Sequence, residues 1–427
     1  MSTATPTSRL PIRPLLPGQT VDGRPATLGV LGGGQLGRMF VQAAQSLGFD
    51  AVVLDPEATS PAGQVSHLTV QGAYDDRQAL ARLAGIAHAV TTEFENVPAD
   101  SMAELASRLP VAPQADAVAI AQDRVREKAL FKRCEPDSNV GPAPYAVIET
   151  AADVDAAPEA LFPGVLKTAR LGYDGKGQAN VATRDELRAA WQQLGGVVCV
   201  LEQRLSLQDE CSVIIARGAD GTVVHLPMQR NLHRGGILAM TEVYEGNVPR
   251  SLANHAVQAT RHIAQALDYV GVLCVEFFVL SDGRLVVNEM APRPHNSGHY
   301  SVDACDVSQF DLQVRTLAGL PLLQPRLHSP TVMLNLLGDL WFDAAGQPRE
   351  LPWAQLLALP GCHLHLYGKR EARAGRKMGH LTLTAATIEA VRATAREAAA
   401  LLGMAPWWDD AASAAQVRAA TDSVQDE

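Results

Sequence analysis

The sequence predicts a multidomain protein of the α/β and α+β classes that begins with a doubly wound, Rossmann-like domain. At 427 residues the chain is about three times as long as a typical domain. From Thr27 onward, short apolar runs alternate with amphipathic helical patterns, as expected for βαβ units. Around residues 271–291, two apolar strand patterns instead flank a tight turn, which indicates an antiparallel hairpin in a later domain.

The composition is that of an ordinary globular protein and excludes several classes of function. Residues are 47% hydrophobic and 19% charged, and the formal net charge of −10 argues against coating a nucleic acid. The six cysteines form no CxxC pair and lie mostly in apolar runs, so we expect reduced core residues. No apolar stretch reaches the roughly 18 residues that would suggest a membrane span. We therefore expect a cytoplasmic protein without nucleic-acid or membrane partners.

Composition shifts along the chain predict four segments. The first is a proline-rich N-terminal leader that we expect to be disordered. A proline- and glycine-rich stretch, EPDSNVGPAPY, indicates a connection between domains. The predicted segments are a leader at 1–26, an N-terminal domain at 27–122, a central domain at 123–325 and a small C-terminal domain at 326–427 that ends in an acidic tail.

A first glycine-rich turn follows the first predicted strand. Gly32, Gly34 and Gly37 match G-x-G-x-x-G, and Asp55 ends the next strand where a ribose-binding acid would lie. Taken alone, this pattern predicts a dinucleotide-dependent oxidoreductase. However, such a turn offers backbone N–H groups and a helix N-terminus to any phosphate. It could also serve only to pack the helix onto the sheet.

A second glycine-rich segment follows a strand that carries a lysine. Lys167 lies in an otherwise apolar strand, and the segment GYDGKGQ at residues 172–178 adds Lys176. A mobile loop of this kind can close over a triphosphate, with backbone N–H groups and lysines as its partners. The alternative is a plain hairpin turn. A buried, unpaired ammonium is costly, which favours the phosphate-binding interpretation.

The apolar hairpin at residues 271–291 carries two glutamates. If Asp282 and Gly283 form a two-residue turn, Glu276 lies directly opposite Glu289. Opposed carboxylates destabilise a sheet unless a cation or a shared proton compensates. Together with Asn288, they would suit magnesium beside a bound nucleotide. A shifted register or solvent-facing glutamates would remove this site.

Six segments follow one another along the chain: GGGQLGRM, TTEFENVP, GYDGKGQ, NLHRGGIL, NEMAPRPHNSGH and AGRKMGHL. Together with the features above, they resemble the ATP-grasp superfamily and, within it, the PurK family of 5-(carboxyamino)imidazole ribonucleotide synthetases. The resemblance implies an ATP-grasp fold and a ligase of purine biosynthesis. The ligase would use ATP, bicarbonate and magnesium (or manganese) to carboxylate 5-aminoimidazole ribonucleotide through carboxyphosphate, giving N5-carboxyaminoimidazole ribonucleotide, ADP and phosphate. It also implies a homodimer.

The resemblance also implies roles for individual residues. The first glycine loop would face the substrate's 5′-phosphate, so that Asp55 loses its ribose role. Metal ligands would be Glu276 and Glu289, and the catalytic residues Arg293, His295 and Asn296. ATP would contact Arg124, Lys167, Gly172, Tyr173, Asp174, Gly175, Lys176, Gly177, Gln178, Glu202, Gln203, Arg204, Leu205, Glu210, His233, Asn288 and Glu289. The ribonucleotide would contact Gly34, Gln35, Leu36, Glu93, Tyr173, Arg293, His295, Asn296, Lys369, Arg376 and Lys377.

Three other functions compete with this hypothesis. A formate-using glycinamide ribonucleotide transformylase shares the fold, but GYDGKGQ, NSGH and AGRKMGHL argue against it. An NAD-dependent oxidoreductase leaves the paired glutamates and the second glycine loop unexplained. A non-catalytic nucleotide sensor would have lost ligand residues, and none is visibly missing. The basic segment that contains Lys369, Arg376 and Lys377 could, without the resemblance, be a solvated charged loop.

Overall fold

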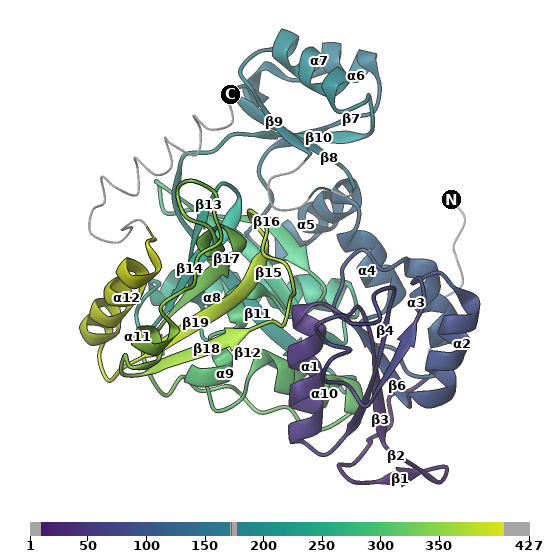
Figure 1. The fold of residues 1–427 in the computed structure, drawn as a ribbon. Coiled ribbons are helices and arrows are strands. Elements are labelled where there is room, and N and C mark those ends of the chain that lie inside the picture. The colour runs from purple at the N-terminus through teal and green to yellow at the C-terminus, as the bar shows by residue number, and fades with distance from the viewer. Residues whose placement is uncertain (1–9, 171, 173–176, 405–427) are drawn as a thin grey trace.

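The computed structural model describes residues 10–404 except 171 and 173–176. Its N-terminal domain is the predicted doubly wound unit, a parallel sheet in the order β5-β4-β3-β6 with helices packed against it (Figure 1). Asp76 caps α2 by accepting hydrogen bonds from the first turn, as expected for a helix N-cap. The elements are β3 (Thr27–Leu31), α1 (Gln35–Ser46), β4 (Asp50–Asp55), β5 (Leu68–Gln71), α2 (Arg77–Ile86), β6 (Ala89–Thr92), α3 (Ala99–Ala106) and α4 (Ala115–Ala121).

The described part of the expected leader, residues 10–26, is folded. It forms a short hairpin of β1 (Thr20–Val21) and β2 (Arg24–Pro25). Ile12 and Leu15 pack against the core of the N-terminal domain, which they share with α1. The expectation of disorder across 1–26 therefore fails for 10–26, because two apolar side chains among the prolines find a hydrophobic surface to cover.

A small antiparallel sheet in the order β7-β10-β8-β9, with α6 and α7 on it, stands apart at the top of Figure 1. The second glycine-rich segment lies between β8 and β9, which pair as an antiparallel hairpin. Lys167 lies opposite Gln178 at the mouth of this loop. The elements are β7 (Tyr145–Ile148), α6 (Ala151–Ala156), β8 (Gly164–Thr168), β9 (Gln178–Val181), α7 (Arg184–Gln193) and β10 (Cys199–Gln203).

The largest sheet has nine strands among the described residues, with the path β16-β15-β11-β13-β14-β17-β19-β18 and β12 paired to β11. Helices α5 and α8 pack on one face, and α10 packs between the other face and α1. The strands are β11 (Leu207–Arg217), β12 (Val223–His225), β13 (Gln229–Arg234), β14 (Ile237–Val243), β15 (Gly271–Leu280), β16 (Leu285–Ala291), β17 (Thr331–Leu337), β18 (Cys362–Leu366) and β19 (Lys377–Thr384). The helices are α5 (Arg124–Ser138), α8 (Arg250–Ala266), α9 (Ser301–Ala304), α10 (Gln309–Ala318), α11 (Trp353–Leu357) and α12 (Ile388–Leu402).

The register of the β15–β16 hairpin differs from the predicted one. The loop has three residues rather than two, and Gly283 adopts a left-handed φ of 80° at its end. A bulge further along the strands then sets Glu276 across from the two residues Asn288 and Glu289. The two glutamates are therefore near neighbours across a bulge and not a directly opposed pair. Pairing on either side of the bulge is Val275 with Met290 and Phe277 with Val287.

Two expectations from composition can be compared with the fold. All six cysteines lie in the described part of the chain, none is in a disulfide, and five are buried. Within residues 10–404, apart from the small gap in the glycine loop, no helix has the length and apolarity needed to cross a bilayer.

Candidate active site

One cleft, with a volume of about 880 Å³, lies between the small sheet, α5, the β15–β16 hairpin and the edge of the N-terminal domain. Most of the predicted site residues line it, although they come from segments far apart in the sequence. The predicted residues in this lining are Arg124, Lys167, Gly172, Gly177, Gln178, Glu202, Gln203, Arg204, Leu205, Glu210, His233, Glu276, Asn288, Glu289, Arg293, His295, Asn296 and Lys377. Tyr173, Asp174, Gly175 and Lys176 lie outside the described residues.

Three cations surround the buried carboxylate of Glu202 on β10. Lys128 Nζ lies 3.1 Å and Lys167 Nζ 3.2 Å from Glu202 Oε2, and an Arg124 guanidinium nitrogen lies 3.9 Å from Oε1. Burial acts to raise the pKa of Glu202, but these cations outweigh it and lower the pKa to about 2. Arg124 and Lys167 of this cluster line the cleft, where their cationic groups can meet the oxygens of a polyphosphate.

Sequence reasoning missed Lys128, which is fully buried on α5. Its Nζ also donates to the backbone carbonyl of Asn288 at 2.9 Å and so ties α5 to the metal-ligand candidates on β16. A neighbouring acid, Glu127, accepts a hydrogen bond from Met290 N at 2.8 Å. The spacing of Arg124 and Lys128 by four residues places both on one helix face. This four-residue spacing is the sequence signal that could have identified Lys128.

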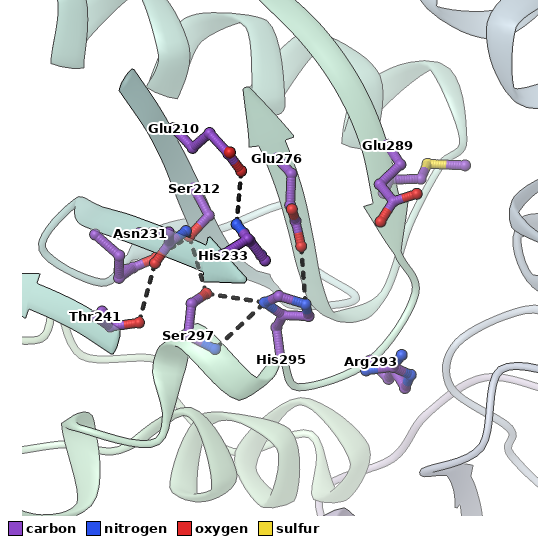
Figure 2. Close-up of polar contacts among 12 residues, drawn as sticks. Glu210, Ser212, Asn231, His233, Thr241, Glu276, Glu289, Arg293, His295 and Ser297 are labelled. Carbon is purple, nitrogen blue, oxygen red and sulfur yellow. Dashed lines mark hydrogen bonds and ion pairs between the residues drawn. The ribbon is translucent and has the colours of Figure 1, made fainter. Parts of the chain in front are cut away.

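His233 on β13 and Glu210 on β11 form a partly buried ion pair in the cleft (Figure 2). His233 Nδ1 lies 2.6 Å from Glu210 Oε2. Burial acts to lower the pKa of His233, but the Glu210 carboxylate outweighs it and raises the pKa to about 9. His233 is therefore a cation at neutral pH. The carboxylate expected to bind ribose hydroxyls is held in place by this partner.

A chain of hydrogen bonds runs from Glu276 through His295 into the central sheet (Figure 2). His295 Nε2 lies 2.9 Å from Glu276 Oε1, and its Nδ1 lies 2.9 Å from Ser297 Oγ. Ser297 Oγ lies 2.9 Å from Ser212 Oγ, which in turn donates to Gln229 Oε1 at 3.0 Å. This chain of hydrogen bonds connects the His295 ring to the central sheet and fixes its orientation.

The direction of these bonds follows from the groups at their end. The Gln229 amide nitrogen donates to a backbone carbonyl, so its oxygen faces Ser212 and takes the single hydroxyl proton of that serine. Ser297 Oγ can then donate to Ser212, and it lies 2.9 Å from His295 Nδ1. The 3.4 Å contact from Ser297 N to the same ring nitrogen is the weaker interaction. Nε2 faces the Glu276 carboxylate, which can only accept, so Nε2 donates to it.

The pKa of Glu276 reflects the same partner. Burial acts to raise it, but the adjacent His295 outweighs burial and lowers the pKa to about 2. One oxygen of this predicted metal ligand is therefore engaged by a histidine. Nearby, the buried Asn288 Oδ1 has no hydrogen-bond partner among the described residues, and Glu289 is 44% exposed with Arg124 at 3.4 Å. Carboxylate and amide oxygens of this kind fit a hard divalent cation.

The loop that follows β16 carries the predicted catalytic residues. Arg293 pairs with Glu95, from the N-terminal domain, and thus spans two domains. Both polar atoms of the buried Asn296 side chain lack partners among the described residues. Buried amides are seldom left unsatisfied, so this one fits a ligand in the cleft. Sequence reasoning chose Glu93 rather than Glu95, because both follow the same short strand and nothing in the pattern distinguishes them.

The first glycine loop does not line the cleft. Its N–H groups bind carboxylates of the protein itself: Glu93 accepts from Gly34 N at 2.8 Å and from Gly37 N at 3.1 Å, and Asp55 accepts from Gly33 N at 2.6 Å. Carboxylates at the N-terminus of α1 are favoured by the helix dipole. This use of Asp55 argues against the dinucleotide-binding alternative. Predicted substrate residues absent from the cleft lining are Gly34, Gln35, Leu36, Glu93, Lys369 and Arg376.

The basic loop reaches the cleft through only one of its predicted residues, Lys377. Lys369 Nζ donates to the Lys377 carbonyl at 2.6 Å, and an Arg376 guanidinium nitrogen donates to the Glu371 carbonyl at 2.7 Å. These two cations satisfy backbone carbonyls of their own loop. They hold its shape and leave Lys377 at the rim of the cleft.

Three family models match the chain. They are the ribonucleotide synthetase preATP-grasp domain at residues 26–122, the ATP-grasp domain at 136–310, and the phosphoribosylaminoimidazole carboxylase C-terminal domain at 331–394. The chain is 43% identical over 364 residues to N5-carboxyaminoimidazole ribonucleotide synthase of Brucella melitensis, a match that covers 84% of this chain and 96% of that one. It is 38% identical over 360 residues to the synthase of Bacillus subtilis, covering 84% of this chain and 91% of that one.

Solved structures agree. The synthetase of Thermus thermophilus superposes with a TM-score of 0.80 at 38% identity, covering 89% of this chain and 99% of that one. A synthase of Aspergillus clavatus, in complex with ADP and 5-aminoimidazole ribonucleotide, superposes with a TM-score of 0.80 at 30% identity and the same coverage. The fold and the resemblance that the sequence predicted are confirmed. The chain belongs to the N5-carboxyaminoimidazole ribonucleotide synthase family of ATP-grasp enzymes.

Proposed function

We propose that this chain carboxylates the amine of 5-aminoimidazole ribonucleotide with bicarbonate and ATP, giving N5-carboxyaminoimidazole ribonucleotide, ADP and phosphate. The family membership supports this reaction as a step of purine biosynthesis. The observation that carries the proposal is that cations suited to a polyphosphate, at Arg124 and Lys167, share one cleft with Arg293 and His295. Phosphate activation and carboxyl transfer can thus occur within one enclosure.

ATP is proposed to occupy the cleft between the small sheet and the β15–β16 hairpin. Lys167 and Arg124 would bind phosphate oxygens, and the paired Glu210 would accept from ribose hydroxyls. Glu276, Glu289 and the free Asn288 oxygen would hold magnesium, or manganese in its place. When bound, the metal would neutralise charge on the phosphate oxygens. The remaining proposed contacts are the glycine loop at 172–178, Glu202, Gln203, Arg204, Leu205 and His233.

The carboxyl-transfer end is proposed to lie at Arg293, His295 and Asn296. ATP would phosphorylate bicarbonate to carboxyphosphate, whose anionic oxygens the Arg293 guanidinium can bind beside the His295 ring. Carboxyphosphate would then release carbon dioxide beside the exocyclic amine, which attacks it. The buried Asn296 amide, with no partner of its own, would orient either reactant. The surrounding walls would exclude water, which would otherwise hydrolyse the intermediate.

For the ribonucleotide, Lys377 and Tyr173 remain proposed contacts. Gly34, Gln35, Leu36 and Glu93 would act only at the edge of the site, with the backbone N–H groups of Gln35 and Leu36 as phosphate donors and Glu93 holding the N–H groups of Gly34 and Gly37. Lys369 and Arg376 would act indirectly, because they hold the conformation of the loop that leads to Lys377. A homodimer in the cytoplasm, where ATP and ribonucleotides are available, completes the proposal.

The test measures ADP release with ATP, magnesium and bicarbonate, with and without 5-aminoimidazole ribonucleotide, together with the labile carboxyamino product. Stimulation by the ribonucleotide that depends on bicarbonate is expected. Glu289→Gln should lose at least about 100-fold in kcat, as expected when a metal ligand is removed. Glu104→Gln, at a surface ion pair on α3, is the matched control and should keep full activity. ADP release that depends on formate and glycinamide ribonucleotide would move the assignment to the transformylase.

A further inference from the structure

A cluster of metal-ligating side chains lies outside the cleft, where β18 and β19 meet α9. His365 and His380 occupy directly paired positions on the two strands, and Asp303 approaches them from α9. One ligand atom from each of these three residues lies within 4.8 Å of the other two. None of the three lines the cleft. The cluster needs an explanation of its own.

His380 is arranged as metal-bound histidines usually are. Its Nδ1 lies 2.9 Å from the hydroxyl of Tyr367, while its Nε2 is buried and has no hydrogen-bond partner among the described residues. If Nδ1–H donates to the tyrosine, Nε2 carries the free lone pair. Metal-bound histidines almost always have the other ring nitrogen fixed in this way by a hydrogen bond. An unsatisfied buried nitrogen is otherwise rare.

The other two residues supply a carboxylate and a second imidazole. Asp303 is 11% exposed, and its Oδ2 lies 2.8 Å from Nε2 of His365. Two atoms at that separation can share a proton. They can equally well occupy two adjacent coordination positions of one metal ion. The rings of His365 and His380 are stacked, with centroids 4.5 Å apart and planes 12° apart. His365 is 28% exposed, so its ring can rotate until its lone pair converges with that of His380.

A second buried histidine lies beside the cluster. His380 and the neighbouring His299, with ring centroids 5.0 Å apart, are both fully buried. His299 Nε2 is a second buried nitrogen without a partner among the described residues. Two imidazoles and one carboxylate form a donor set suited to zinc-like ions, and not to magnesium.

We propose that Asp303, His365 and His380 form a binding site for one divalent transition-metal ion of the Zn²⁺ type. The ion would fasten the β18–β19 hairpin to α9. Both ends of that connection lead to the reaction cleft: α9 follows the loop of Arg293 and His295, and Lys377 begins β19. The site is independent of the nucleotide and of the proposed carboxylation.

The experiment uses full-length protein stripped of metal with a chelator, then equilibrated with Zn²⁺ in the presence of excess Mg²⁺ and ADP, which fill the nucleotide cleft. Metal content per chain is measured by mass spectrometry, and Co²⁺ is used as a second probe for its visible absorption. One Zn²⁺ per chain and a Co²⁺ spectrum typical of nitrogen ligation are expected. Zn²⁺ should also raise the melting temperature, since it binds only the folded chain.

Variants locate the ion. His365→Gln and Asp303→Asn should each abolish stoichiometric binding, and Tyr367→Phe should weaken it about 10–100-fold by freeing the His380 ring. His67→Gln is the matched control, because His67 lies 3.2 Å from Asp50 in a surface histidine–carboxylate pair without a third ligand. Wild-type protein that binds no more Zn²⁺ than background, or equal binding in His365→Gln, would overturn the proposal. Melting temperatures of metal-free variants exclude misfolding as the cause of lost binding.

Discussion

The position of Arg293 depends on a residue of another domain. Its guanidinium pairs with Glu95, which follows the last strand of the N-terminal sheet, and the same group faces the cleft. The Arg293 cation lowers the pKa of Glu95, and burial is the weaker, opposing influence. Glu95 is therefore an anion that orients Arg293 without needing to contact the reactants.

Replacing Glu95 with glutamine should leave the fold intact and reduce kcat. The isosteric amide keeps the shape, but the charge-assisted hydrogen bond becomes a neutral one, so Arg293 samples other orientations. We expect a loss of about 10- to 100-fold in kcat for carboxylation, with the KM for ATP unchanged. Steady-state kinetics with each substrate varied provide the measurement. A change confined to the KM for ATP would show that Glu95 does not act through Arg293.

His233 should contribute stability that depends on pH. Its pKa is raised to about 9 in the folded protein from an ordinary value of 6.5, so the Glu210–His233 pair contributes fully below about pH 6.5 and is lost as the pH rises through about 9. Calorimetry should find that His233→Asn lowers the melting temperature most near pH 6. The difference from wild type, on the order of 2 kcal/mol, should shrink by about pH 10. A constant difference across this range would contradict the assignment.

The β15–β16 hairpin marks how far sequence patterns can predict an element. Its two strands and its turn were predicted because apolar runs and an Asp-Gly pair are local signals. The register was not, since Ser281 joins the loop and a second irregularity lies near Glu276. Bulges depend on the packing of both faces of the strand, which a local pattern does not contain. The longer loop and the bulge each shift the pairing of the strands, but Glu276 still lies near Glu289. These two residues of the candidate site therefore lie together although the predicted register was wrong.

A pair of glycine substitutions tests this account of the turn. Gly283→Ala should destabilise the protein by about 1 kcal/mol, because the left-handed φ of 80° is unfavourable for alanine. Gly85→Ala, in the last turn of α2, should stabilise it by up to about 1 kcal/mol, because alanine is the better helix former. An added Cβ contacts nothing within 4 Å at either position, so backbone conformation alone is compared. Urea unfolding should give opposite signs; equal signs would refute the assigned turn.

At the scale of the whole molecule, one sheet joins two of the predicted domains. Strand β14 pairs with β17 through residues about 90 positions apart, such as Met240 with Leu334. The sequence predicted a separate small C-terminal domain because a strand pattern does not reveal which sheet edge it will join. For the same reason, the site was predicted from its motifs, whereas Lys128 and Glu95, which act across elements, were not. The continuous sheet implies that these two parts unfold together.

The ion pair between Arg392 on α12 and Glu242 on β14 provides a test of this coupling. Two hydrogen bonds, of 2.6 and 2.8 Å, join the groups, and Glu242 is 7% exposed. Arg392→Ala leaves that carboxylate buried without its partner, which should cost about 2–3 kcal/mol, somewhat less than for a fully buried pair because Arg392 is 34% exposed. Arg188→Ala, at an exposed pair on α7, should cost less than about 1 kcal/mol.

Urea unfolding, followed by far-UV circular dichroism and by tryptophan fluorescence, would measure both effects. Trp341 and Trp353 contribute to the fluorescence, and they pack against the hydrophobic core of β17, β19 and α12, here called the C-terminal layer. Because β17 and β19 extend the central sheet, the two signals of Arg392→Ala should still coincide in one transition shifted to lower urea. An early fluorescence transition that precedes the loss of circular dichroism would mean that the C-terminal layer unfolds as an independent unit. The shared sheet would then be a contact between two domains and not a common core.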